Sequence, residues 1–355
     1  TSVHAFASDP TRGVYILAYL IIVVGGSLTL FAFKAPKMIQ GDGFSGVSRE
    51  SFLLLNNLLL AVMAAMVLLG TLYPLIVDAF GAGKISVGAP YFGMLFALLL
   101  APVVIAIPFA VYSRWRSDRL PRISRQLIVP AALALVAAIL VIVKIPEAGL
   151  TGVAGVAGGV WLISANLLLP IKRIREQGHF TRTETAMTMA HFGVGVFLIG
   201  VSLTGAISSE KHLRMSEGDQ FELAGYTFVF NGTRGVQGPN YVADEGEFLV
   251  MKNGVEITRM YPEKRRYARD GQMMTEAAID SGLTRDLYVS MGEPLDNGQA
   301  WAVRIYHKPF IRWIWLGALF MAAAGVLAAG DRRYRKQSST ASAQVPTTDT
   351  EAALS

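Results

Sequence analysis

The chain has 355 residues, of which 52% are hydrophobic and only 16% charged, and its formal net charge is +6 at pH 7. That much apolar surface exceeds what one soluble core needs, so we expect much of it to face lipid. The sequence has no cysteine, which excludes disulfides, thiolate nucleophiles and cysteine-ligated metals within this chain.

Seven apolar runs predict a polytopic α-helical membrane protein with seven transmembrane helices. Each run is close to the roughly 20 residues that a helix needs to cross hydrocarbon. The runs lie near 13–33, 52–77, 90–112, 127–143, 149–170, 186–206 and 310–330. Helices one to six and an outer N-terminal loop thus occupy 1–206, and the last helix lies in 309–336. No initiator methionine or charged segment precedes the first run, so we expect a fragment or a processed product rather than a signal peptide.

The basic residues lie in short alternate loops, which indicates membrane topology and argues against a nucleic-acid partner. They are Lys34, Lys37 and Arg49, then Arg114, Arg116, Arg119, Arg122 and Arg125, then Lys172, Arg173, Arg175 and Arg182, and finally Arg332, Arg333, Arg335 and Lys336. The other loops hold little beyond Lys84 and Lys144. This asymmetry predicts an N-terminus outside and a C-terminus in the cytoplasm. The cytoplasmic tail over 337–355 is rich in Ser, Thr, Ala and Gln, and this composition predicts that it is disordered.

The segment 207–308 predicts one extracytoplasmic β-rich domain between the last two helices. Its Asn253-Gly254 pair, flanked by alternating residues, is a strong hairpin signal because Asn-Gly accepts the positive φ of a type I′ turn. Further strand candidates are Phe221–Phe230, Asp286–Met291 and Ala300–Tyr306. Several short strands of this kind suit a small barrel or sandwich.

Of the five histidines, His191 is the one that lies inside a predicted span, on its cytoplasmic half. An ionisable side chain at membrane depth is costly and so suggests a function, and neutral imidazole is a common axial ligand of haem iron. Gly193, Gly195 and Gly200 follow it, and these small residues would admit either a flat macrocycle or a neighbouring helix. The alternative is a histidine that bonds a neighbouring carbonyl at a helix contact.

A six-coordinate iron needs a second histidine, and no other predicted span contains one, so a partner ligand must come from another chain. His4 lies just outside the first span, where an exposed histidine is usually solvated, although an outer site near the membrane would suit an amphipathic cofactor. His307 is interpreted as an interfacial residue, and His179 and His212 as solvated loop residues.

The other polar and small residues of the spans are interpreted as structural, since they can bond across helices or let helices approach closely. They are Asn56, Asn57 and Asn166, and Gly152, Gly155 and Gly159. The sequence shows no Gly-rich phosphate loop, zinc signature or nucleophile elbow.

Several well-spaced stretches together resemble the C-terminal half of the CcmF family, the large membrane subunit of the bacterial cytochrome c haem lyase. The resemblance covers roughly residues 3–336. The stretches are Val3–Asp9, Ser48–Ser51, Leu53–Asn57, Gly70–Pro74, Lys84–Phe92, the helix around His191, Met274–Asp280 and Ile305–Pro309.

The resemblance implies a role for two histidines. His4 matches one of two external histidines that ligate the haem being delivered, which makes it the candidate catalytic residue. His191 matches one of two membrane histidines that ligate a resident b-type haem. The other member of each pair, and the family's tryptophan-rich haem-handling motif, belong to the N-terminal half. Arg12 is a candidate contact for a haem propionate.

The resemblance also implies that the chain is part of a haem lyase in the bacterial inner membrane, with its functional face in the periplasm. Such an enzyme attaches haem to the thiols of apocytochrome c, and the resident haem would reduce the incoming one, with quinol as a candidate electron donor. The implied partners are the missing N-terminal half, a subunit that binds apocytochrome, a haem chaperone, apocytochrome c and membrane lipid. The alternative is a cofactor-free assembly scaffold that binds apocytochrome or partner subunits through its β domain, and a transporter has little support because the spans hold no paired charges.

Overall fold

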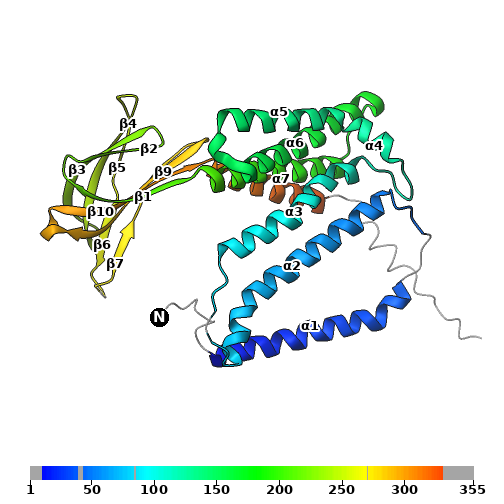
Figure 1. Cartoon of the computed structure of the whole chain (residues 1–355), viewed down its shortest axis with the longest axis horizontal. Helices are drawn as coiled ribbons and strands as arrows, with labels where there is room; N and C mark the ends of the chain where they lie inside the picture. Colours follow the sequence, from blue (N-terminus) through cyan, green and yellow to red (C-terminus); the bar gives the residue numbers. More distant parts are fainter. Residues whose placement is uncertain (1–9, 39–42, 84, 270, 331–355) are drawn as a thin grey trace, which may run out of the picture. The chain divides into compact units, whose positions relative to one another are not determined.

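The computed structural model describes residues 10–38, 43–83, 85–269 and 271–330. The chain forms two compact units, Thr1–Val129 and Pro130–Ser355 (Figure 1). The helices of the first unit are α1 (Pro10–Met38), α2 (Arg49–Ala79), α3 (Ala89–Tyr112) and the short α4 (Leu120–Gln126). In the second unit, α5 (Ile128–Lys144, which begins just before the boundary), α6 (Gly149–Gln177) and α7 (Arg182–Ile207) precede ten strands, and α8 (Ile311–Ala329) follows them.

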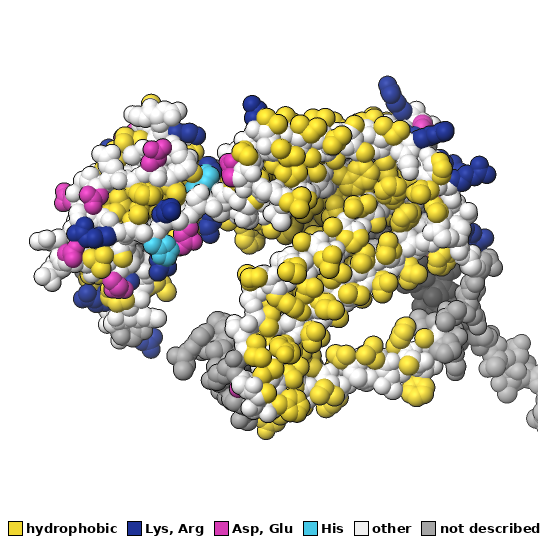
Figure 2. Space-filling model, viewed as in Figure 1, with side chains coloured by type: hydrophobic (Ala, Val, Ile, Leu, Met, Phe, Trp, Pro, Cys, Tyr) yellow, Lys and Arg dark blue, Asp and Glu magenta, His cyan; other side chains and the backbone are white. Residues whose placement is uncertain are grey.

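The helices coincide with the predicted apolar runs. Six of those in the described residues are long and apolar enough to cross a membrane, and α4 with α5 makes a seventh if that bent pair is one span. Hydrophobic side chains cover the helices, while many of the charged ones gather on the β domain and at helix ends (Figure 2). The protein therefore has the character of a polytopic membrane protein.

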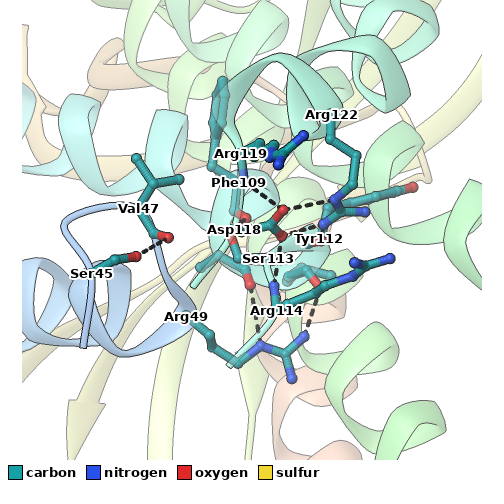
Figure 3. Close-up of polar contacts among 12 residues, drawn as sticks. Ser45, Val47, Arg49, Phe109, Tyr112, Ser113, Arg114, Asp118, Arg119 and Arg122 are labelled. Carbon is teal, nitrogen blue, oxygen red and sulfur yellow. Dashed lines mark hydrogen bonds and ion pairs between the residues drawn. The ribbon is translucent and has the colours of Figure 1, made fainter. Parts of the chain in front are cut away.

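The basic loop between α3 and α4 is an ordered cap (Figure 3). The carboxylate of Asp118 accepts hydrogen bonds from the backbone N–H groups of Arg114 (2.8 Å) and Arg119 (2.7 Å) and from the guanidinium of Arg122. The bond with Arg122 is the main reason that the pKa of Asp118 lies well below its usual range, against the opposing effect of burial. Arg49 donates to the carbonyl of Val111 (2.8 Å) at the end of α3. Arg49, at the start of α2, and Arg122, in α4, which donates to the carbonyl of Tyr112 (2.8 Å), thus close the end of α3 as well as carrying charge.

The β domain contains a four-stranded sheet, in the order β1-β10-β9-β8, and a six-stranded sheet, in the order β2-β3-β4-β6-β7 with β5 paired to β4. The strands are β1 (Ser209–Ser216), β2 (Gln220–Leu223), β3 (Tyr226–Gln237), β4 (Tyr241–Lys252), β5 (Val255–Met260), β6 (Glu263–Tyr267), β7 (Met273–Glu276), β8 (Ala278–Ser281), β9 (Arg285–Leu295) and β10 (Ala300–Pro309). Residues from both sheets, among them Phe228, Phe248 and Leu287, form one apolar core.

Two strand predictions have different outcomes. Asn253 (φ 51°) and Gly254 (φ 78°) join β4 to β5, so the predicted hairpin is confirmed. The prediction of one strand over Phe221–Phe230 is wrong, because Ala224 (φ 52°) and Gly225 (φ 75°) turn the chain between β2 and β3.

The β domain is tied to the ends of α7 and α8. Thr204 on α7 donates to the carbonyl of Pro309 (2.7 Å), where β10 ends. The indole N–H of Trp313 on α8 donates to the carbonyl of Leu283 (3.1 Å), in the β8–β9 loop. These bonds hold the domain at the end of α7 that lies away from Arg182.

Candidate functional site

The site begins with a close contact between α6 and α7. The two helices run antiparallel because a short turn after Gly178 joins them, and Gly152, Gly155 and Gly159 lie along the contact. A Cβ at Gly159 would approach the carbonyl oxygen of Gly195 to 2.7 Å, so only glycine fits at this depth. The prediction that these glycines serve helix packing is confirmed.

The glycines near His191 also serve helix packing. A Cβ at Gly195 would meet the carbonyl oxygen of Gly159 at 2.8 Å, and one at Gly193 would meet that of Gly317 on α8 at 2.7 Å. Gly200 is equally close to α8. Helices α6 and α8 therefore cover these glycines, and the interpretation that they leave room for a macrocycle is wrong.

His191 projects from α7 toward Asn166 of α6. Its Nδ1 lies 3.2 Å from Oδ1 of Asn166, and that asparagine is fully buried. The amide nitrogen of Asn166 donates to the carbonyl of Leu162 (2.8 Å), within its own helix. In the part of the chain that the structure describes, Nε2 of His191 makes no hydrogen bond.

His191 and Asn166 lie well inside the helix bundle. His191 lies nine residues after Arg182, the first residue of α7, which is about 14 Å along the helix axis. One turn earlier on α7, the hydroxyl of Thr188 is buried without a hydrogen-bond partner among the described residues. The predicted alternative, a histidine bonded across a helix contact, accounts for Nδ1 but leaves Nε2 without a role.

In the described residues, the donor set fits one ligand to a haem iron and no complete metal site. Over residues 10–38, 43–83, 85–269 and 271–330, no group of three or more His, Cys, Asp or Glu side chains could hold a metal ion. A neutral imidazole with a free nitrogen can supply one ligand to an iron, and the opposite ligand would then come from elsewhere.

The other predicted residues fall into two groups. His4, and the side chain of Arg12, lie outside the described residues. His179 is exposed in the turn between α6 and α7, as predicted. His212 is on β1, not in a loop, and its Nε2 lies 2.5 Å from an oxygen of Glu210, so that part of its interpretation is wrong.

His307 has a more enclosed position than the interfacial one that we expected. It lies on β10 with its ring 6.0 Å from the ring of Tyr226, and its Nδ1 is buried without a partner in the described residues. Burial lowers the pKa of His307, and the nearby charges of Arg285 and Lys252 lower it further. Among the described residues, it belongs to no group of three or more His, Cys, Asp or Glu side chains that could hold a metal ion.

Comparisons with known proteins identify relatives of this chain. Residues 206–309 match the family model described as CcmF C-terminal beta-sandwich. The chain is 46% identical over 341 residues to the cytochrome c-type biogenesis protein CcmF of Pseudomonas aeruginosa, covering 94% of this chain and 52% of the relative. It is 42% identical over 338 residues to CcmF of Escherichia coli, covering 95% of this chain and 52% of that protein.

A solved structure shares the fold. The protein titled cytochrome c heme lyase CcmF superposes with a TM-score of 0.72 at 20% identity, covering 90% of this chain and 50% of that one. The chain thus spans about half the length of the relatives that it matches.

Proposed function

Because the chain belongs to the CcmF family, we propose that it is the part of a cytochrome c haem lyase that holds haem iron from one side. The observation that carries the proposal is the geometry of His191, whose Nδ1 is fixed by Asn166 while Nε2 makes no hydrogen bond in the described residues. The names of the relatives, cytochrome c-type biogenesis protein and cytochrome c heme lyase, support the reaction class.

We place the chain in the inner membrane of a bacterium with seven spans. The N-terminus and the β domain lie in the periplasm and the C-terminus in the cytoplasm. Support comes from Arg173 and Arg182, which lie at the α6–α7 turn, while the β domain is attached at the opposite end of α7. The proposed division is 1–206 for six spans, 207–308 for the β domain, 309–336 for the last span and 337–355 for the tail.

His191 would hold the iron of a resident b-type haem through Nε2, together with a histidine from the half of the family protein that this chain does not span. Such a haem supplies single electrons, which would keep the incoming haem iron ferrous. The helix packing around Gly195 and Gly193 excludes water from the α6–α7–α8 contact and keeps the imidazole at a fixed depth.

His4 would bind the iron of the substrate haem at the outer surface. In the reaction, each thiol of apocytochrome c adds across a haem vinyl group: the sulfur bonds to one vinyl carbon and the thiol hydrogen passes to the other. The thiols come from the substrate, in keeping with a chain that has no cysteine. Positioning the two reactants would supply much of the rate.

Absorption spectra of the chain purified together with the rest of the lyase test this function. We expect b-type bands in the wild type, their loss in His191→Ala, and their retention in His4→Ala, which should instead lose cytochrome c formation. A wild-type complex without b-type bands would remove the proposed role of His191.

One observation favours a second candidate function, a scaffold that grips an unfolded partner. The four residues of β7 are all exposed, and β7 ends the order of the six-stranded sheet. An exposed edge strand can add a segment of another chain by backbone pairing. Cytochrome c formation that survives both histidine variants but fails when Thr275 is replaced by proline would favour the scaffold.

A further inference from the structure

Asn166 is the hydrogen-bond partner of His191, and the role inferred for it below rests on the function proposed for His191. Asn166 lies on the face of α6 that carries the packing glycines, since it is seven residues after Gly159. Gly195 is likewise four residues after His191 on α7. The antiparallel contact that joins Gly159 to Gly195 therefore brings Asn166 next to His191.

The orientation of the Asn166 amide follows from its second hydrogen bond. The carbonyl oxygen of Leu162 can only accept, so the amide group that faces it at 2.8 Å is the NH₂. The group that faces His191 is then the amide oxygen, which can only accept as well. Turning the amide over would set its oxygen against the carbonyl oxygen of Leu162, and two acceptors cannot bond; because Asn166 is fully buried, that loss would not be made up by water.

This orientation selects one tautomer of His191. Because Oδ1 of Asn166 accepts, the proton of a neutral imidazole must lie on Nδ1, and the lone pair must lie on Nε2. A hydrogen bond at the distal nitrogen of a ligating histidine also fixes the ring plane and raises the basicity of the ligand nitrogen. We propose that Asn166 is a positioning residue that presents Nε2 of His191 to the haem iron.

The substitution Asn166→Leu tests this assignment in the purified complete lyase. Hydrogen-bond partners of a ligating histidine contribute about 10–100-fold to metal affinity, so we expect haem retention to fall by about that factor. The midpoint potential of the remaining b-type haem should rise, because a less basic imidazole stabilises ferric iron less. Asn166→Asp keeps an accepting oxygen and should retain the b-type bands, with a midpoint potential no higher than that of the wild type.

The matched control is Ser164→Ala. Ser164 is on the same helix and its hydroxyl donates to the carbonyl of Val160 (2.6 Å), so the variant also removes a largely buried bond but does not touch His191. It should change neither haem retention nor the midpoint potential.

The outcomes separate the two proposals. If the wild type holds b-type haem and Asn166→Leu matches it in retention and potential, the role of Asn166 is overturned while that of His191 stands. If the wild type lacks b-type haem, the function proposed for His191 fails first. Should Asn166→Leu not accumulate, Asn166→Asp decides, because a loss of its bands or a potential above the wild type contradicts the assignment.

Discussion

The β domain and the α6–α7–α8 bundle differ in how completely this chain buries their large apolar side chains. In the domain, large side chains such as Phe228 and Phe248 are completely buried in a core made by this chain alone. In the bundle, Leu319 and Val326 of α8 stay 66% and 74% exposed, so lipid or another part of the protein must cover them.

Each region also contains a histidine nitrogen of interest that makes no hydrogen bond in the described residues. In the domain it is Nδ1 of His307, which is enclosed beside Tyr226. In the bundle it is Nε2 of His191, whose partner atom Nδ1 is already fixed. The comparison teaches that the domain is complete as a structure, whereas the bundle has the features of a site that another component completes.

The largest effect on haem binding is expected from widening the α6–α7 contact. A Cβ in Gly195→Ala would meet the carbonyl oxygen of Gly159 at 2.8 Å and Ile163 at 2.7 Å, so the helices must shift. Overpacking of this kind costs about 1–3 kcal/mol, and we expect haem retention in the complete lyase to fall at least about 10-fold. The control Gly205→Ala, on the same helix with nothing within 4 Å, should keep the b-type spectrum. Equal spectra in the two variants would contradict a site built on this contact.

The second prediction concerns the core of the β domain. Phe248→Ala removes a fully buried ring that stacks on Phe230 at 4.8 Å, and it should lower the free energy of unfolding of the domain by about 3–5 kcal/mol. Denaturant unfolding of the full chain, followed by tryptophan fluorescence, measures this. Val255→Ala, at a side chain that is 67% exposed, should stay within about 0.5 kcal/mol of the wild type.

The hairpin turn should give a smaller effect. Gly254 has φ 78°, and an alanine there adopts the left-handed conformation at a cost of roughly 1–2 kcal/mol. Gly235 on β3 has open space and no positive φ, so Gly235→Ala is the control for adding a methyl group. If the two variants unfold at the same denaturant concentration, the turn does not determine the register of β4 and β5.

The smallest effect is a pH dependence carried by His307. Its pKa in the folded protein lies below the ordinary value, so the unfolded chain takes up a proton more readily. Stability is therefore fully present above about pH 6.5, falls as the pH drops through that value, and levels off below the folded pKa. Between about pH 7 and pH 5, His307→Gln should lose less stability than the wild type. A larger loss in the variant would contradict the assignment.

The long helices and one hairpin could be predicted from the sequence, because membrane spans and tight turns depend on residues that are close together in the chain. The apolar runs located the long helices, and Asn253-Gly254 located a hairpin. The turn at Ala224 and Gly225 was missed, since it interrupts a run with strong strand propensity. Strands β1, β6, β7 and β8 were also missed, because the charged and exposed residues of β1, β6 and β7 hide the alternation.

The candidate site was predictable in part. The position of His191 at membrane depth identified it as a residue of interest, but its partner depends on how α6 and α7 are rotated against each other. A signal was present: Gly159 and Asn166 share one face of α6, and His191 and Gly195 share one face of α7. The sequence offered two uses for the glycines near His191, and only the packed helices distinguish them.

The most direct test of the account replaces the imidazole of His191 and then returns it. We expect the complete lyase carrying His191→Gly to lack b-type bands, and added free imidazole to restore low-spin b-type bands by occupying the vacated ligand position. A variant that keeps these bands without imidazole, or a wild-type complex that never shows them, would contradict the claim that His191 binds haem iron.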